Sequence, residues 1–287
     1  MLYLELFIQG IVQGSLYGLM TLGLTLVYGL LRILHVAHAG LFTLGGYIGV
    51  LVTNQTGSFG LALIAAMITV GVMGMGVYKF AYEPLLKRPP FVILIASIAL
   101  FIASEEIFRI IFGPYGLSYE NPPLKGQVEL FGGMKIKVGE IIVIGFSLAM
   151  LSLLAWLSKY TRTGMAWRAT VSDPEIAQAF GVNKNKVRYL NFFMASALTA
   201  TAGVFVALLN NLVEPTMGSV PSYKGLAIIV LGGLGNIRGT LIASLLLGIV
   251  ESYGTIYLGK ILDRDAIAFG LLIIVLMIRP KGILGEK

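Results

Sequence analysis

The chain has 287 residues, of which 57% are hydrophobic and only 12% charged, and its mean hydropathy is +0.87. Soluble domains carry roughly 25% charged residues, so the composition excludes a soluble globule and indicates an integral membrane protein. The net charge of +7 comes from basic residues spread over short loops without an aromatic platform, which argues against nucleic-acid binding. Cysteine is absent, so disulfides, thiol nucleophiles and cysteine-ligated metals are excluded.

Long apolar windows predict the membrane segments, because a helix needs about 20 apolar residues to cross about 30 Å of hydrocarbon. Residues 6–31 carry no charge, and neither do residues 33–78, which are long enough for two crossings joined near 54–58. The further candidates are 91–112, 141–158, 190–213, 226–236, 240–258 and 266–278. Continuous apolar runs predict helices rather than a barrel. We predict an all-α integral membrane protein of two related halves with about eight membrane segments, in which 226–236 is a half-helix or a broken span.

The distribution of lysine and arginine predicts the orientation of the chain. If the basic loop at 159–190 is cytoplasmic, most of the 21 basic residues lie inside the cell. The N-terminus then lies outside and the C-terminus lies in the cytoplasm. The first segment lacks a basic region before it and a cleavage site after it, so we expect it to remain as a span. The basic residues expected outside are Arg109, Lys125, Lys135, Lys137, Lys224, Lys260 and Arg264.

Two stretches, 30–40 and 231–239, are glycine-rich or carry histidine and interrupt the apolar sequence. Interrupted segments at corresponding positions of two halves indicate a transport site near the midplane, since irregular backbone persists there only beside protein or a watery cavity. Glycine-rich turns at ordinary membrane borders are the alternative. The candidate residues of the translocation path are His35, His38, Thr43, Gly46, Glu105 and Glu251.

His35 and His38 are the only histidines, and their i, i+3 spacing puts them on one face of a helix. A metal site would need further ligands, and residues 33–78 contain no Asp, Glu or Cys. We therefore predict no metal site. Lining a polar path and a hydrogen-bonded structural role stay open as alternatives for the two side chains.

Four charged residues stand out within the apolar segments, namely Glu105, Glu106, Arg109 and Glu251. Glu105 and Arg109 have the i, i+4 spacing of a helical ion pair, near the outer border of their segment. Glu251 lies about midway along its segment and has no evident partner in the sequence. Its charge must face a cavity or a partner, or be protonated, because an isolated charge in the membrane is costly.

The two longest polar connections carry structure of their own. The outer loop at 113–139 contains alternating residues on either side of a Gly-Gly pair, which predicts a short β-hairpin at 127–138. The inner loop at 159–190 contains a short helix. Ser172 or Asp173 is its predicted N-cap, and Gly181 ends it.

Further features favour this short helix and give it a docking role. Pro174 suits the first helical position, and Glu175 places negative charge in the first turn. Ile176, Ala177 and Phe180 form an apolar side that has no lipid to bury into, so we predict that the helix docks in a groove of a soluble partner.

A resemblance to a known family rests on motifs that occur throughout the chain. These are Tyr28-Gly29, Ala37-His38, Gly45 with Tyr47, Glu83-Pro84, 168–183, 231–235, 248–251 and the tail 279–285. Together they resemble the permeases of branched-chain amino-acid ABC importers, specifically the H-type subunit. The resemblance implies a heterodimer with an M-type permease, two cytoplasmic ATPases and an extracytoplasmic solute-binding protein, in the inner (plasma) membrane of a prokaryote.

The resemblance also implies that the chain is a permease and not an enzyme. It has no catalytic residues and no phosphate-binding Gly-x-x-x-x-Gly-Lys-Ser/Thr motif, so ATP and Mg are expected on the partner subunits, and no cofactor is expected on this chain. ATP binding would close the ATPase pair, move the docked helix and switch the pathway. The residues expected to couple to the ATPases are Ser172, Asp173, Pro174, Glu175, Ala177, Phe180 and Gly181.

Departures from the family pattern concern the cargo. His35-Val36 and Ala39 stand where the family usually has Asn and Gly around the Ala-His pair, and Glu105-Glu106 stand where it often has Gln-Asn. The alternative cargoes are therefore other amino acids, amides or urea. An ion-coupled secondary transporter is the alternative mechanism, but it would not need the capped cytoplasmic helix.

Overall fold

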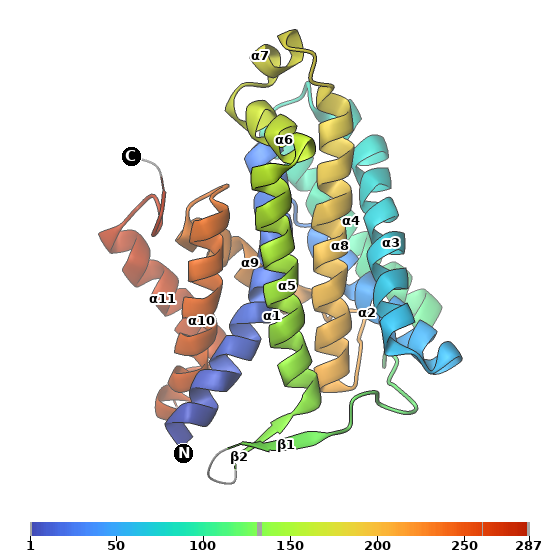
Figure 1. Cartoon of the computed structure of the whole chain (residues 1–287), viewed down its shortest axis with the longest axis vertical. Helices are drawn as coiled ribbons and strands as arrows, with labels where there is room; N and C mark the ends of the chain where they lie inside the picture. The colour runs from blue at the N-terminus through green and yellow to red at the C-terminus, as the bar shows by residue number, and fades with distance from the viewer. Residues whose placement is uncertain (1, 131–133, 260, 286–287) are drawn as a thin grey trace.

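A computed structural model of the protein describes residues 2–130, 134–259 and 261–285 (Figure 1). Within these ranges the chain forms eleven α-helices, two short helical turns and a pair of β-strands. The α-helices are α1 (Leu2–Leu31), α2 (His38–Thr56), α3 (Phe59–Val77), α4 (Pro90–Phe112), α5 (Val138–Tyr160), α6 (Arg162–Ser172), α7 (Pro174–Ala179), α8 (Lys184–Asn210), α9 (Ser219–Gly232), α10 (Ile237–Leu258) and α11 (Arg264–Ile278). The helical turns η1 (Tyr78–Tyr82) and η2 (Glu83–Leu85) continue α3. Apart from the strands, the all-α prediction is confirmed.

Six helical segments of the described chain are long and apolar enough to cross a membrane. They are α1, α3 with its continuation to Leu85, α4, α5, α8 and α10. The short segment predicted at 226–236 is displaced: α9 covers Ser219–Gly232, and residues 233–236 form a bend before α10. With 14 residues α9 is roughly 21 Å long, too short for a full crossing.

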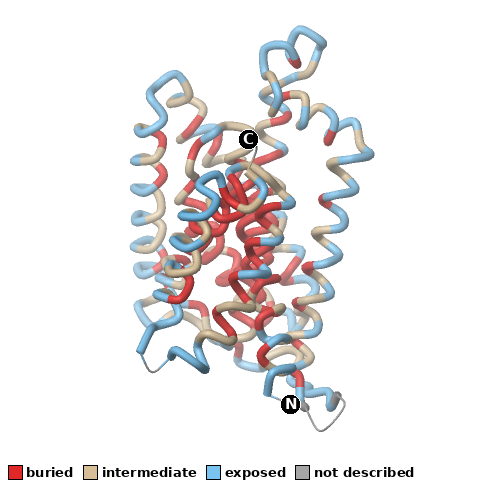
Figure 2. Tube along the Cα trace, turned by 90° about the vertical axis from the view of Figure 1, so that its left-hand side faces the viewer, coloured by how far each residue is buried: buried red, intermediate tan, exposed pale blue. Residues whose placement is uncertain are grey.

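The buried residues concentrate in the middle of the molecule (Figure 2), and α1 and α8 are the most buried of the long apolar helices. In the most apolar window of α1 and of α8, 78% of the residues are buried, compared with 17% for α4 and for α5. The outward sides of α4 and α5 carry large apolar residues, for example Ile102, Ile110 and Leu148. Such surfaces suit contact with lipid or with another membrane subunit rather than with water.

Close backbone contacts hold α1 against α10 and α2 against α8. A Cβ added to Gly248 of α10 would lie 2.7 Å from the Cα of Gly14, and one added to Gly45 of α2 would lie 2.5 Å from the Cα of Ala200. Neither position tolerates a side chain without movement of backbone. Small residues therefore set the spacing of these helices, as is usual where helices associate in lipid.

We expect Gly248→Ala to reduce the free energy of unfolding by about 1–3 kcal/mol, because the added methyl group overpacks a backbone contact. The control is Gly76→Ala in α3, where a Cβ would meet nothing within 4 Å. The control should change stability by less than about 1 kcal/mol. Thermal unfolding of the detergent-solubilised protein measures both variants, and equal melting temperatures would contradict the packing argument.

The two ends of the bundle differ in structure. The N-terminus and the strands β1 (Gln127–Leu130) and β2 (Met134–Lys137) lie at one end, and α6 and α7 form the other (Figure 1). The strands pair antiparallel with Gln127 opposite Lys137. The Gly-Gly turn predicted between them lies outside the described residues. Just before the hairpin, Leu117 exchanges two backbone hydrogen bonds of 2.9 Å with Val213, which follows α8.

Candidate functional site

The N-termini of α2 and α9 meet beside the middle of α1. Residues 32–37 return along α1, so that His38 at the start of α2 lies with Nε2 3.2 Å from the carbonyl oxygen of Met20. That level is roughly 16 Å from the end of α1 at Leu31. Gly218, which precedes α9, packs against the carbonyl oxygen of Ala39. Two helices thus begin in the interior of the bundle, side by side.

The segment that meets the 30–40 interruption inside the bundle is not the predicted segment, 231–239. A Cβ on Gly29, near the end of α1, would lie 3.7 Å from the carbonyl oxygen of Gly235, so that bend lies at the end of the bundle. The segment that reaches the first interruption is 211–218, between α8 and α9. Its sequence signal is the Glu214-Pro215 pair, because proline cannot continue a helix.

The two histidines are buried, each 1% exposed, and their ring centroids lie 5.2 Å apart. His35 Nδ1 lies 2.6 Å from the hydroxyl of Tyr82, which donates to Ser97 Oγ at 2.9 Å. His38 also contacts the hydroxyl of Thr199 in α8. The two histidines therefore contact three surrounding elements, η1, α1 and α8, which favours the hydrogen-bonded structural alternative. Within the described residues no group of three His, Asp or Glu is arranged to hold a metal ion.

Thr43, Gly46 and Glu105 all lie along the segment that leads into α9. A Cβ on Gly46 would lie 2.8 Å from Met217, and Glu105 accepts a hydrogen bond of 2.6 Å from the hydroxyl of Ser219. The predicted ion pair between Glu105 and Arg109 is wrong. Arg109 binds Glu106 instead, at 2.8 Å, because Glu105 is turned inward toward α9.

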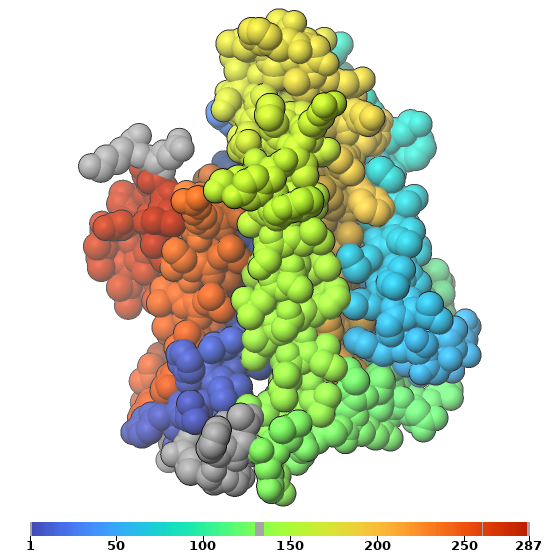
Figure 3. All heavy atoms as spheres, viewed as in Figure 1, coloured from blue at the N-terminus to red at the C-terminus, as the bar shows by residue number. Residues whose placement is uncertain are grey.

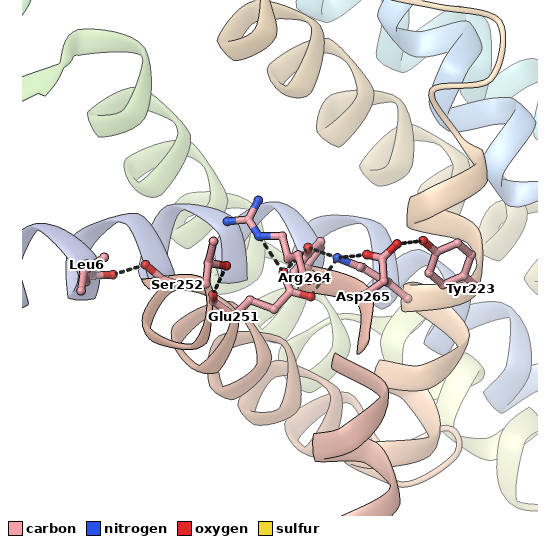
Figure 4. Close-up of polar contacts among 9 residues, drawn as sticks. Leu6, Tyr223, Glu251, Ser252, Arg264 and Asp265 are labelled. Carbon is pink, nitrogen blue, oxygen red and sulfur yellow. Dashed lines mark hydrogen bonds and ion pairs between the residues drawn. The ribbon is translucent and has the colours of Figure 1, made fainter. Parts of the chain in front are cut away.

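Glu251 is fully buried and has a lysine partner that the sequence interpretation missed. Lys224 of α9, 2% exposed, places Nζ 2.9 Å from Glu251 Oε1 and 2.9 Å from Asp265 Oδ1. Tyr17 of α1 donates to Glu251 Oε2 at 2.7 Å, and Arg264 Nε lies 3.6 Å from the same oxygen. Figure 4 shows Glu251, Arg264 and Asp265 within this network. Of the alternatives left open for Glu251, a cavity, a charged partner or protonation, the structure shows charged partners, which the sequence did not identify.

The same network corrects the placement of Lys224, which was expected in an outer loop. Lys224 interrupts the apolar sequence before residue 226, yet α9 begins at Ser219 and carries the lysine into the interior. Two cations and two anions, contributed by α9, α10 and α11, neutralise one another. Buried charges persist only when they are paired in this way.

A cavity of about 240 Å³ adjoins the network. Lys224, Arg264 and Asp265 contribute charged groups to its wall, and Leu16 and Phe42 are among its apolar lining residues. Its wall therefore combines both signs of charge with apolar surface. It is distinct from the narrow crevice that His35 and His38 line with Ser222.

The short helix of the 159–190 loop is α7, and its ends follow the predicted chemistry. Asp173 is the N-cap, since its Oδ1 accepts hydrogen bonds of 2.9 Å from the backbone N–H groups of Glu175 and Ile176. Ser172, the alternative, is the last residue of α6. Gly181 follows the helix with φ of +85°, a conformation that strains residues with a side chain.

The apolar side of α7 is only partly as predicted. Phe180 is 85% exposed and Ile176 57% exposed, whereas Ala177 is 4% exposed. Ala177 faces inward because its carbonyl oxygen accepts the N–H of Val182, which folds the following turn onto that side. An open groove of about 580 Å³ lies between α6 and α7, and Met165 contributes to its wall. In the space-filling view this region projects from one end of the molecule (Figure 3).

Comparison with known proteins gives relatives over almost the whole chain. The chain is 29% identical to the high-affinity branched-chain amino acid transport system permease protein LivH of Salmonella typhimurium, covering 99% of this chain and 96% of that protein. It is 30% identical to the corresponding permease protein BraD of Pseudomonas aeruginosa, with the same coverage. The permease protein LivM of Escherichia coli is 23% identical and is covered over 68% of its length.

A solved structure and a family model complete the comparison. PsaBC from Streptococcus pneumoniae in complex with Fab has a TM-score of 0.51 and 13% identity, over 97% of this chain and 92% of that chain, which shows a likeness of fold alone. The family model described as branched-chain amino acid transport system / permease component matches residues 6–278. The chain is a multi-pass membrane permease component and not itself an enzyme. It belongs to the family of permease components of branched-chain amino acid transport systems.

Proposed function

We propose that this chain is one of two permease subunits of an ATP-driven importer for branched-chain or related amino acids. Its partners are a homologous M-type permease, two cytoplasmic ATPases that bind ATP and Mg, and an extracytoplasmic solute-binding protein. The similarity to both LivH-type and LivM-type permeases supports a pair of related subunits. The chain lies in the inner or plasma membrane of a prokaryote, with its N-terminus outside and its C-terminus in the cytoplasm.

The observation that carries the coupling role is the projecting helix α7. It is rigidly capped by Asp173, and it presents Ile176 and Phe180 to solvent beside an apolar groove. A soluble monomer would bury such a surface, so its exposure indicates a protein partner. Basic residues flank α7 on both sides, in α6 and in the first turns of α8, which supports a cytoplasmic position. The partner is then an ATPase subunit.

The translocation path is proposed to run where α2 and α9 begin. Helices that start inside a membrane protein direct their N-terminal N–H groups and partial positive charge into the interior, where a polar solute needs partners. Of the predicted path residues, Thr43, Gly46 and Glu105 border this region, the two histidines brace it, and Glu251 anchors α9 through Lys224. We propose α2 and α9 as corresponding interrupted helices of two related halves.

The test is reconstitution of the complete assembly in liposomes, with the binding protein outside and ATP inside. We expect radiolabelled L-leucine to accumulate only when ATP and both ATPases are present. Accumulation of an amide or urea in place of leucine would show that the cargo is different and would still support ATP-driven import. Accumulation driven by an ion gradient without the ATPases would overturn the importer proposal in favour of secondary transport.

A further inference from the structure

The cavity of about 240 Å³ beside Lys224 is small and chemically two-sided. It is below the roughly 300–1,000 Å³ of sites for drug-sized ligands, so it suits a small solute. Five helices, α1, α2, α8, α9 and α11, contribute to its wall. Charged and apolar side chains both line the site.

Lys224 itself is already committed to protein partners. An ammonium group has three donors, and Nζ of Lys224 lies within reach of Glu251, Asp265 and the hydroxyl of Tyr17, the last at 3.2 Å. The lysine therefore positions its neighbours and has no donor left for a solute. Recognition must come from the groups that the lysine holds in place.

Arg264 and Asp265 retain free donor and acceptor groups that can bind a solute. The guanidinium of Arg264 is 47% exposed and approaches Glu251 through Nε alone, while its two Nη atoms make no hydrogen bond to any residue that the structure describes. Asp265 is 43% exposed and accepts from Lys224 and Tyr223, which leaves lone pairs on its carboxylate. Figure 4 shows these two neighbours at the start of α11. One offers a planar set of donors and the other an anionic acceptor.

The apolar part of the wall determines what the rest of a solute can be. Leu16, Phe42 and Val206 line the cavity, and the first two are 5% and 2% exposed. A purely polar solute would leave these apolar side chains without an apolar partner to pack against. A solute with both charged groups and an aliphatic side chain would match both surfaces.

We propose that this cavity is a binding site for a zwitterionic amino acid with an aliphatic side chain, whose carboxylate binds Arg264 and whose ammonium group binds Asp265. The proposal rests on the proposed function and gives this subunit a recognition site of its own, separate from that of the external binding protein. Guanidinium and carboxylate form paired, charge-assisted hydrogen bonds, which select for the carboxylate over an amide. The aliphatic side chain packs against Leu16, Phe42 and Val206.

The first experiment measures binding of tritiated L-leucine to the permease–ATPase assembly in nanodiscs without the binding protein. Leucinamide lacks the carboxylate, and 4-methylpentanoate lacks the amino group. We expect each analogue to compete at least about 10-fold more weakly than unlabelled leucine, because each loses a charge-assisted interaction. Competition by both analogues as strong as that by leucine would overturn the proposal.

The second experiment measures uptake by proteoliposomes carrying variants of the complete assembly. Arg264→Gln should raise the KM for leucine about 10- to 100-fold, and Arg264→Lys should restore part of the loss. Arg109→Gln is the matched control, since Arg109 is 45% exposed and also pairs with a glutamate, but lies on α4 away from the cavity. The control should keep the KM of the unmodified assembly.

A third variant guards against loss of folding in the arginine variants. Val206→Phe fills the apolar side and should weaken uptake of leucine more than uptake of alanine. If the unmodified assembly accumulates leucine with ATP, while Arg264→Gln and Val206→Phe leave the KM for both amino acids unchanged, this site is wrong and the importer proposal stands. If the unmodified assembly accumulates no amino acid, the proposed function itself fails.

Discussion

Replacing Lys224 by methionine should lower the melting temperature of the detergent-solubilised permease by roughly 10 °C, corresponding to about 3–5 kcal/mol. The physical reason is that Glu251 is fully buried and would lose its closest cationic partner. Arg264 Nε at 3.6 Å and the hydroxyl of Tyr17 at 2.7 Å would remain as weaker compensation. The loss of stability should be largest for the packing of α9, which forms no other ion pair with α10 among the described residues.

The double variant Lys224→Met/Glu251→Gln separates charge from packing. Removing both charges should restore most of the lost stability, because the main cost of the single variant is an unpaired buried anion. Lys135→Met is the control, since its ion pair with Glu129 is exposed and worth at most about 1 kcal/mol. If the double variant is as unstable as Lys224→Met, the charge argument is wrong and packing of the lysine stem dominates.

Replacing Phe180 by aspartate should reduce ATP-dependent uptake at least about 10-fold while the permease still inserts and folds. Phe180 is 85% exposed, so the change costs the isolated subunit little, but an aromatic anchor buried in a partner's groove contributes 2 kcal/mol or more, roughly 30-fold in affinity. The ATPases should then hydrolyse ATP without stimulation by solute. Parallel measurement of uptake and ATPase activity in one proteoliposome preparation tests this.

Tyr115 provides the control for that variant. It is 90% exposed and lies in the 113–139 loop, away from α7, so Tyr115→Asp replaces an aromatic residue by a charged one in a different part of the molecule. Uptake should stay within about twofold of the unmodified assembly. Normal uptake by Phe180→Asp, or an equal loss in both variants, would remove α7 from its coupling role.

The ends of α7 were predictable because capping is local chemistry. Asp173 and Gly181 bind backbone groups two or three residues away, and Pro174 acts on its own backbone, so the local sequence contains everything needed. The orientation of Ala177 was not predictable in the same way. It depends on how the turn at Val182 folds back and on a preceding helix, α6, that the basic composition of the loop did not reveal.

The buried network was missed for a reason of long-range packing. Lys224 and Glu251 are far apart in sequence, and hydropathy alone treats a lysine as the end of a segment. Only the pairing of α9 with α10 makes the lysine tolerable inside the bundle. The same limitation applies to the interruptions: the sequence shows that the chain is broken at 231–239, but which break returns to the middle of α1 depends on the packing of α2 against α9.

The backbone bridge between Leu117 and Val213 links the loop that contains the hairpin directly to the interior of the bundle. Its two hydrogen bonds join the strand-like stretch before the hairpin to the linker that enters α9. We therefore expect a displacement of this loop to reach the linker before α9 directly through these two hydrogen bonds, without passing along the long helices. That linker leads to Lys224, 11 residues after Val213, and so connects the loop to the charged part of the cavity wall.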